Sequence, residues 1–258
     1  MTKSLRVEFL GTGTSQGVPV IGCDCEVCLS NDPRDQRLRV SILISQAGRN
    51  LVVDAGPDFR QQMLRAKVEN IDAVLLTHEH NDHIIGLDDV RPFNFRHKKN
   101  IPVYGTPPVL QELQQRFAYV FDHNPYPGAP QLDLHAIGKE HSFRVGDFQV
   151  QPVEVLHGQL PVLGFRFGDF CYITDAKTIS EEERRKLQHL DTLVLNALHH
   201  DEHHSHLNIS EALALIKDIN PLRTYLTHIS HRMGRYAEVQ AQLPDNVWLA
   251  YDGLQIDV

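Results

Sequence analysis

The segment His78-Glu79-His80-Asn81-Asp82-His83 decides how the rest of this chain is interpreted. It reads H-x-H-x-D-H, so three imidazoles and one carboxylate fall within a single short stretch. Neutral imidazole nitrogens and a carboxylate suit a divalent ion such as zinc or manganese. A catalytic ion usually takes three protein ligands and keeps one position for water. Four ligands in one stretch therefore predict two ions side by side.

The composition limits size, charge and partners. The chain has 258 residues, of which 41% are apolar and 22% charged, so we expect one domain over residues 1–258. The formal charge is −8, whereas a protein that grips a nucleic acid polymer usually presents a basic face. Nucleic acid is therefore not an expected partner. Bound divalent ions would offset much of this charge, so a small anionic substrate is compatible with it.

The N-terminal stretch, Met1-Thr2-Lys3-Ser4-Leu5, lacks the apolar core of a signal peptide. No run approaches the roughly 18 apolar residues of a membrane span. We therefore expect a cytoplasmic protein with no membrane partner. In that compartment, clustered cysteines favour metal binding over a disulfide framework.

Short β-rich runs and helical patterns share the chain. The expected strands cover residues 5–10, 40–45, 50–53, 73–77, 148–156, 165–174, 192–195, 223–227, 247–251 and 254–258. The expected helices cover residues 58–66, 107–118, 180–188 and 208–218. In the last of these, Asn208 and Glu211 have the spacing of a capping box. This mixture predicts layered sheets with covering helices, in the α/β class.

Metal-compatible residues stand just beyond the ends of several expected strands. They are Asp54, His78, His157, Asp175 and His228. Functional sites in sheet proteins often gather at strand ends, where loops converge on a rigid frame. We therefore expect these five side chains to come together.

A second group of ligand-type residues is Cys23, Cys25 and Cys28, in the pattern C-x-C-x-x-C. Three thiolates in one loop, residues 22–28, need only a fourth ligand to close a tetrahedral zinc site, and His231 is the candidate. An exposed group of three free thiols would oxidise readily, which argues against unliganded cysteines. Cys171 lies in a strand-like run and is expected to be a buried apolar residue.

The H-x-H-x-D-H segment, with the later His157, Asp175 and His228, resembles the metallo-β-lactamase superfamily over nearly the whole chain. The resemblance implies a four-layer αββα sandwich, with two mixed β-sheets flanked by helices. It also implies a ligand set: His78, His80 and His157 for one ion, Asp82, His83 and His228 for the second, and Asp175 as the bridge. Asp54 either hydrogen-bonds behind these ligands or is only a turn residue at a strand end.

A narrower resemblance rests on the opening Leu10-Gly11-Thr12-Gly13-Thr14-Ser15-Gln16-Gly17-Val18-Pro19, the cysteine triplet and Thr227-His228-Ile229-Ser230-His231. These segments look like the PhnP group of cyclic-phosphate phosphodiesterases from bacterial phosphonate breakdown. The glycine spacing, G-x-G-x-x-x-G, does not match a dinucleotide fingerprint. The resemblance implies a structural zinc held by Cys23, Cys25, Cys28 and His231, and a homodimer.

Histidines crowd the segment from His199 to His206. We expect most of it to be a solvated loop. The resemblance singles out His206, two residues before the expected helix cap, where free N–H groups favour a phosphate. His206 could donate a hydrogen bond to a phosphoryl oxygen or protonate the leaving group. His203 and His204 are the alternatives for this role.

The resemblance implies a dinuclear metal phosphodiesterase with two zinc or manganese ions. A hydroxide shared by ions about 3.5–4 Å apart would attack phosphorus, with Asp82 and His206 assigned to catalysis. The expected substrate is 5-phosphoribosyl 1,2-cyclic phosphate or a related 2′,3′-cyclic nucleotide. Lactonase, thioesterase and pyrroloquinoline-quinone biosynthesis-like functions are the alternatives within the superfamily. A transfer RNA endonuclease would need a basic RNA-gripping arm, which is not visible, and a non-catalytic metal store would not leave coordination positions open.

Overall fold

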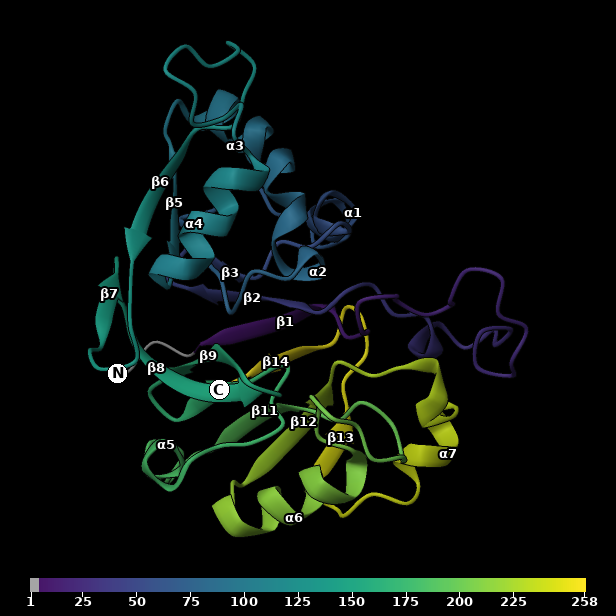
Figure 1. Ribbon diagram of the computed structural model, residues 1–258. Coiled ribbons are helices and arrows are strands. Elements are labelled where there is room, and N and C mark those ends of the chain that lie inside the picture. The colour runs from purple at the N-terminus through teal and green to yellow at the C-terminus, as the bar shows by residue number, and fades with distance from the viewer. Residues whose placement is uncertain (1–4) are drawn as a thin grey trace.

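The computed structural model describes residues 5–258, and in that range the chain forms two mixed seven-stranded sheets packed face to face (Figure 1). Met1–Ser4, on which the absence of a signal peptide was judged, lies outside the described residues. Within residues 5–258, no helix is long and apolar enough to cross a membrane.

The first sheet has the strand order β14-β1-β2-β3-β4-β5-β6. Its strands are β1 (Arg6–Gly11), β2 (Ser41–Gln46), β3 (Arg49–Val53), β4 (Ala73–Leu75), β5 (Ile101–Gly105), β6 (Leu132–Ala136) and β14 (Gln255–Asp257). From β14 to β3 the neighbours are antiparallel, and from β3 to β6 they are parallel.

The second sheet has the order β13-β12-β11-β10-β9-β8-β7. Its strands are β7 (Phe143–Val145), β8 (Phe148–His157), β9 (Leu160–Phe167), β10 (Phe170–Tyr172), β11 (Thr192–Asn196), β12 (Arg223–Thr227) and β13 (Val247–Leu249). Here the neighbours from β7 to β10 are antiparallel and those from β10 to β13 are parallel.

Helices cover the outer face of each sheet (Figure 1). With the first sheet lie α1 (Phe59–Arg65), α2 (Asn81–Ile84), η2 (Ile85–Val90), α3 (Arg91–His97) and α4 (Pro107–Arg116). With the second lie α5 (Glu181–Arg185), α6 (Ile209–Ile219), η3 (His231–Met233) and α7 (Tyr236–Gln240), and η1 (Pro33–Asp35) belongs to the segment between β1 and β2. The four-layer αββα sandwich is therefore confirmed.

The strand sequences explain these layers, because successive side chains of a strand point to opposite faces. In β2, Ile42 and Ile44 belong to the core between the sheets, whereas Leu43 packs on the helix side. In β11, Val194 faces the other sheet and Leu193 packs on the helix side. Such strands are buried on both faces, which is why they read as continuous apolar runs.

Most of the expected elements are confirmed to within a few residues. The capping box at the start of α6 is complete: the Asn208 side chain accepts from the Glu211 N–H, and the Glu211 side chain accepts from the Asn208 N–H. The single strand expected over residues 165–174 is wrong. Gly168 turns the chain with φ 59°, so that β9 and β10 pair as an antiparallel hairpin. The helical segment from α2 to α3 was not expected.

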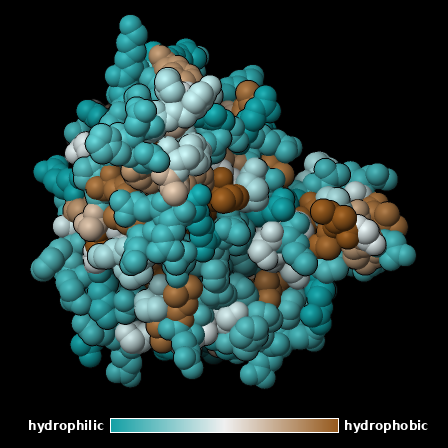
Figure 2. Space-filling model, turned by 45° about the horizontal axis from the view of Figure 1, so that its top comes forward, coloured by the Kyte–Doolittle hydropathy of each residue, from teal (hydrophilic) through white to brown (hydrophobic). Residues whose placement is uncertain are grey.

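The chain between β1 and β2 projects beyond the sheets as an arm, drawn in purple at the right of Figure 1. It carries apolar surface (Figure 2), and its most exposed apolar side chains are Ile21, 98% exposed, and Leu29, 66% exposed. The base of the arm is fixed to the loop after β12, where the Ile229 N–H donates to the Thr12 carbonyl at 2.9 Å.

Candidate functional site

The candidate site lies at the carboxyl ends of strands from both sheets. Asp54 follows β3, His228 follows β12, Asp175 comes shortly after β10, and His157 is the last residue of β8. Asp54, Asp175 and His228 have a left-handed backbone, with φ of 63°, 58° and 54°. This conformation is uncommon for residues other than glycine, and where it occurs it often marks a functional site. Each strand thus ends in a turn that redirects its last side chain.

The structure brings together the three histidines expected to share one ion. His78 Nε2 lies 2.9 Å from His80 Nδ1. The His157 ring centroid is 5.2 Å from that of His80 and 5.8 Å from that of His78. His78 is fully buried, whereas His80 reaches the surface. The group therefore runs from the protein interior to the surface.

The residues expected to hold the second ion also meet. His83 Nε2 lies 3.3 Å from an Asp82 carboxylate oxygen. The rings of His83 and His228 are stacked, with centroids 6.1 Å apart. His83 and His228 are buried, and Asp82 is partly exposed.

Asp175 stands between the two groups. Its carboxylate oxygens lie 3.7 Å from His78 Nε2, 3.5 Å from His83 Nε2 and 3.1 Å from His228 Nδ1. Burial alone would raise the pKa of Asp175, but His228 and His83 hold it well below its usual range. Asp175 is therefore a carboxylate anion within reach of both groups, which is the place of a bridging ligand.

Asp54 orients the ligand segment and is more than a turn residue. Its carboxylate is buried and lies 2.7 Å from His83 Nδ1. It also accepts hydrogen bonds from the Thr77 N–H and hydroxyl, both at 2.9 Å. Burial lowers the pKa of His83, but Asp54 and Asp175 outweigh it and raise that pKa well above its usual value. A carboxylate behind a ligating histidine fixes the ring and the free nitrogen.

The same kind of support is given to His157 by the histidine-rich loop. Its Nδ1 lies 2.9 Å from the Ser205 carbonyl oxygen. Because a carbonyl can only accept, Nδ1 carries the proton and Nε2 keeps its lone pair. Neither Ser205 nor Thr77 was singled out from the sequence. Both are ordinary polar residues, and no sequence signal distinguishes them from others.

The side chains present fit divalent ions. The described residues give buried His83 Nε2 and His228 Nδ1 no hydrogen-bond partner of good geometry, although both face carboxylate oxygens. Two sets of possible ligand atoms each lie within 4.8 Å of one another: His78, His83 and Asp175, and His157, Asp175 and His206. Imidazoles combined with carboxylates suit zinc or manganese. The second set adds His206, which the sequence assigned to the substrate, to the possible ligands.

The loop before α6 differs from its expected form. His199 and His206 are 4% and 9% exposed, so the segment is only partly solvated. Two first-turn amides of α6 are also occupied, since the Ile209 N–H donates to the His199 carbonyl and the Glu211 N–H to the Asn208 side chain. These amides cannot bind a phosphate as expected, and imidazoles face the site instead.

His206 lies against both ion groups. Its ring centroid is 4.4 Å from that of His157 and 4.9 Å from that of His228. Burial, together with His228, lowers the pKa of His206 to about 2. The ring is therefore neutral at pH 7 and offers a single N–H as a hydrogen-bond donor.

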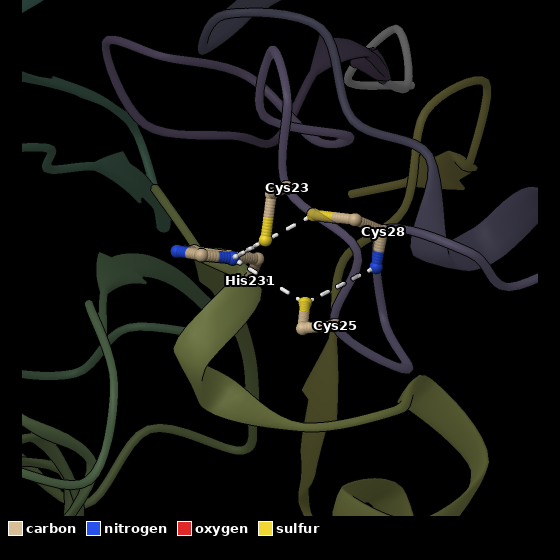
Figure 3. A group of neighbouring side chains, drawn as sticks. All are labelled: Cys23, Cys25, Cys28 and His231. Carbon is tan, nitrogen blue, oxygen red and sulfur yellow. Dashed lines mark hydrogen bonds between the residues drawn. The ribbon is translucent and has the colours of Figure 1, made fainter.

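The cysteine group closes around one nitrogen (Figure 3). The sulfur atoms of Cys23, Cys25 and Cys28 lie 3.3, 3.4 and 3.6 Å from His231 Nδ1. Three sulfurs and one imidazole nitrogen are a ligand set typical of structural zinc. Cys171 is fully buried in the core, and burial raises its pKa to about 12, as expected for an apolar role.

The two centres are joined through one loop. His228 and His231 are three residues apart, and Ile229 between them is bonded to the base of the arm at Thr12. The Thr12 hydroxyl accepts from buried Arg37 at 2.8 Å and donates to Asp252 at 2.8 Å. An ion bound by the cysteines would therefore hold the loop that carries His228.

Comparison with known proteins agrees with this geometry. A family model described as "Beta-lactamase superfamily domain" matches residues 49–229, a span that includes the H-x-H-x-D-H segment and His228. The chain belongs to the metallo-β-lactamase superfamily.

Within the superfamily, the chain is similar to a solved structure described as a new diphosphatase from the PhnP family. The two share 37% of their residues with a TM-score of 0.93, over 99% of this chain and 97% of that one. Zinc-bound PqqB from Methylobacterium extorquens has a TM-score of 0.77 at 21% identity, over 98% of this chain and 100% of that chain, which is a likeness of fold.

A curated relative carries a different name. The octanoyltransferase of Porphyromonas gingivalis (strain ATCC BAA-308 / W83) is 42% identical over 253 residues. These residues are 97% of this chain but 51% of that protein. The chain thus spans about half the length of this relative.

Proposed function

We propose that this protein is a phosphodiesterase that opens small cyclic phosphate esters, such as 5-phosphoribosyl 1,2-cyclic phosphate or a 2′,3′-cyclic nucleotide. The observation that carries the proposal is the position of His206, a neutral imidazole packed against the candidate ligands His157 and His228. The whole-length similarity to a PhnP-family diphosphatase supports phosphorus chemistry.

The residues of the site have separate tasks in this proposal. His78, His80 and His157 on one side and Asp82, His83 and His228 on the other hold two divalent ions, with Asp175 shared. When bound, such ions supply a water of lowered pKa and positive charge for the phosphoryl oxygens. Asp54 fixes His83, and Ser205 fixes His157. His206 donates a hydrogen bond to the ester oxygen that leaves.

The proposal is tested with the metal-loaded protein and a panel of substrates. The panel contains a ribose 1,2-cyclic phosphate, a 2′,3′-cyclic nucleotide, a linear diester, a diphosphate, a lactone and an octanoyl thioester. We expect the cyclic esters to have the highest kcat/KM. Turnover of the lactone or the thioester alone would show that the proposal is wrong.

A second candidate is hydrolysis of a linear diphosphate, which is favoured by the description of the PhnP-family structure. The same ions and the same donor would serve a phosphoanhydride. Acyl transfer chemistry is a third, because a 42% identical relative is named octanoyltransferase. That relative is about twice as long as the region aligned, so its other half is the simpler source of its name. The diphosphate and thioester arms of the panel separate these candidates.

Replacing His206 with alanine distinguishes phosphorus chemistry from lactone hydrolysis. A phosphodiesterase that uses His206 as a donor should lose about a hundredfold or more in kcat. A lactonase has no such need and should keep its turnover. Metal content measured on the same samples separates a donor from a ligand, since His206 is also within reach of His157 and Asp175.

A further inference from the structure

The loop before α6 holds an imidazole that the proposed function does not use. His203 stacks on His206, with ring centroids 5.0 Å apart and an angle of 29° between the planes. His206 in turn lies 4.9 Å from His228. The exposed fraction rises from 2% for His228 to 9% for His206, and His203 is partly exposed. His203 therefore stands between the candidate metal centre and solvent.

Ser205 determines where the proton of His203 lies. The Ser205 N–H is 3.3 Å from His203 Nδ1, and the Ser205 hydroxyl is 3.2 Å from the same nitrogen. A backbone N–H can only donate, so Nδ1 accepts and the ring carries its proton at Nε2. Over residues 5–258, no side chain or carbonyl accepts from this Nε2–H. The same Ser205 orients His157 through its carbonyl, so one residue positions a candidate ligand and a free donor.

Groups near His203 that could hold an anion are already engaged: Lys177, whose charge acts on His203, is paired with Glu211, with its Nζ 2.7 and 3.0 Å from the carboxylate oxygens. Two amides in the first turn of α6, those of Ile209 and Glu211, donate to His199 and Asn208. Two buried imidazole nitrogens on either side of His203, Nδ1 of His199 and Nδ1 of His206, have no hydrogen-bond partner among the described residues. Buried polar atoms without a partner are rare in folded proteins, and each calls for an explanation such as a bound ligand.

We propose that His203 is a substrate-contacting residue whose Nε2–H donates a hydrogen bond to an anionic oxygen of the substrate, outside the group that is cleaved. This inference rests on the proposed function and deepens it. It assigns the substrate a second anionic group, a phosphate or a carboxylate, on the solvent side of the reacting phosphorus. His203 is thus a specificity residue, whereas His206 acts on the leaving oxygen.

The test compares two substrates and three variants of the metal-loaded protein. The substrates are a ribose 1,2-cyclic phosphate with a phosphate on its 5-hydroxyl and the same compound without it. His203→Phe keeps the stacked ring but removes the donor, and His203→Gln returns an N–H near the position of Nε2. His204→Phe is the matched control, because His204 is exposed and its ring lies 4.4 Å from that of His203, a contact that phenylalanine keeps. Circular dichroism shows whether each variant is folded.

We expect His203→Phe to raise KM for the phosphorylated substrate about tenfold or more, as for the loss of a hydrogen bond to a charged group. Its kcat, and its KM for the other substrate, should stay unchanged. His203→Gln should recover most of the loss, and His204→Phe should resemble the wild type. An unchanged KM, an equal effect on both substrates, or a loss in kcat alone would overturn the assignment of His203.

Failure of the proposed function gives a different result. If the wild type cleaves neither compound, the phosphodiesterase proposal is wrong, and calorimetry with inorganic phosphate then tests His203 alone. Weaker phosphate binding by His203→Phe than by wild type and His204→Phe would support the assignment. Equal binding by all three would reject it.

Discussion

The two candidate metal centres differ in where their ligands come from and in how completely these ligands would fill the coordination sphere of an ion. The cysteine centre takes three sulfurs from one loop and one nitrogen from His231, all of them partly exposed. The histidine–aspartate centre collects side chains from strand ends in both sheets and is largely buried. Its possible ligand atoms form two sets of three that share Asp175.

The difference separates a stabilising centre from a reactive one. Four soft ligands around one point complete a tetrahedron and leave no position for a substrate. In the histidine–aspartate centre, three protein ligands lie around each of two points, which would leave a coordination position for water or substrate. The first arrangement takes three of its four ligands from one short loop, while the second depends on the whole fold. The following experiments test whether the centres are as different as this.

The largest effect is expected from replacing Asp175 with asparagine. This change keeps the shape but removes the charge that faces His78, His83 and His228. At least one ion of this centre should be lost, and turnover should fall by on the order of a hundredfold or more. Elemental analysis and kinetics on the same preparation check this. The matched control is Asp169→Asn, a carboxylate that is 76% exposed. Full metal content in Asp175→Asn would show that Asp175 is not a bridging ligand.

A smaller effect is expected for Asp54→Asn. The carboxylate lies 2.7 Å from His83 Nδ1 and helps to raise the pKa of that histidine. Loss of such a supporting carboxylate typically weakens metal binding about 10–100-fold. Competition with a chelator measures the affinity. A metal affinity equal to that of the wild type would show that Asp54 does not support the metal centre and is only a turn residue.

Cys25→Ser tests the other centre. We expect three ions per chain in the wild type and two in the variant, with a lower melting temperature because the arm is released. Turnover should fall less than in the Asp175 and Asp54 variants, since only the loop that carries His228 is loosened. Cys171→Ala is the control, and it should keep all three ions. The structural role is disproved if Cys25→Ser retains three ions, or if the wild type never holds more than two.

The smallest effect concerns the thiols of the metal-free protein. The Cys28 N–H, with His231, lowers the pKa of Cys25 from 9.0 to about 6, whereas burial raises the pKa of Cys28 to about 11. Because the folded pKa of Cys25 is the lower one, its thiolate favours the folded state at high pH, and this contribution is lost as the pH falls through about 6. At pH 7, iodoacetamide should therefore label Cys25 before Cys28, as read by peptide mass spectrometry. Labelling in the opposite order would contradict the hydrogen bond to Cys25.

The sequence predicts which candidate ligands come together but not the hydrogen bonds that orient them. His78, Asp175 and His228 were expected to meet because each follows an apolar strand, and strand ends share an edge of a sheet. The roles of Thr77 and Ser205 could not be predicted, since they depend on backbone groups brought close only by the fold. The helices from α2 to α3 were not predicted, because the ligand motif interrupts the helical pattern of apolar residues. The strand break at Gly168 could have been predicted, because Gly168-Asp169 is a common turn pair.

The two ends of the described chain lie together at the edge of the first sheet. The Leu5 N–H donates to the Val258 carbonyl and the Val258 N–H to the Leu5 carbonyl, both at 2.8 Å. The other end of β1 points to Thr12 and the candidate site. The same pairing makes the protein suited to circular permutation, because a short linker could join the ends without disturbing any strand that carries a ligand.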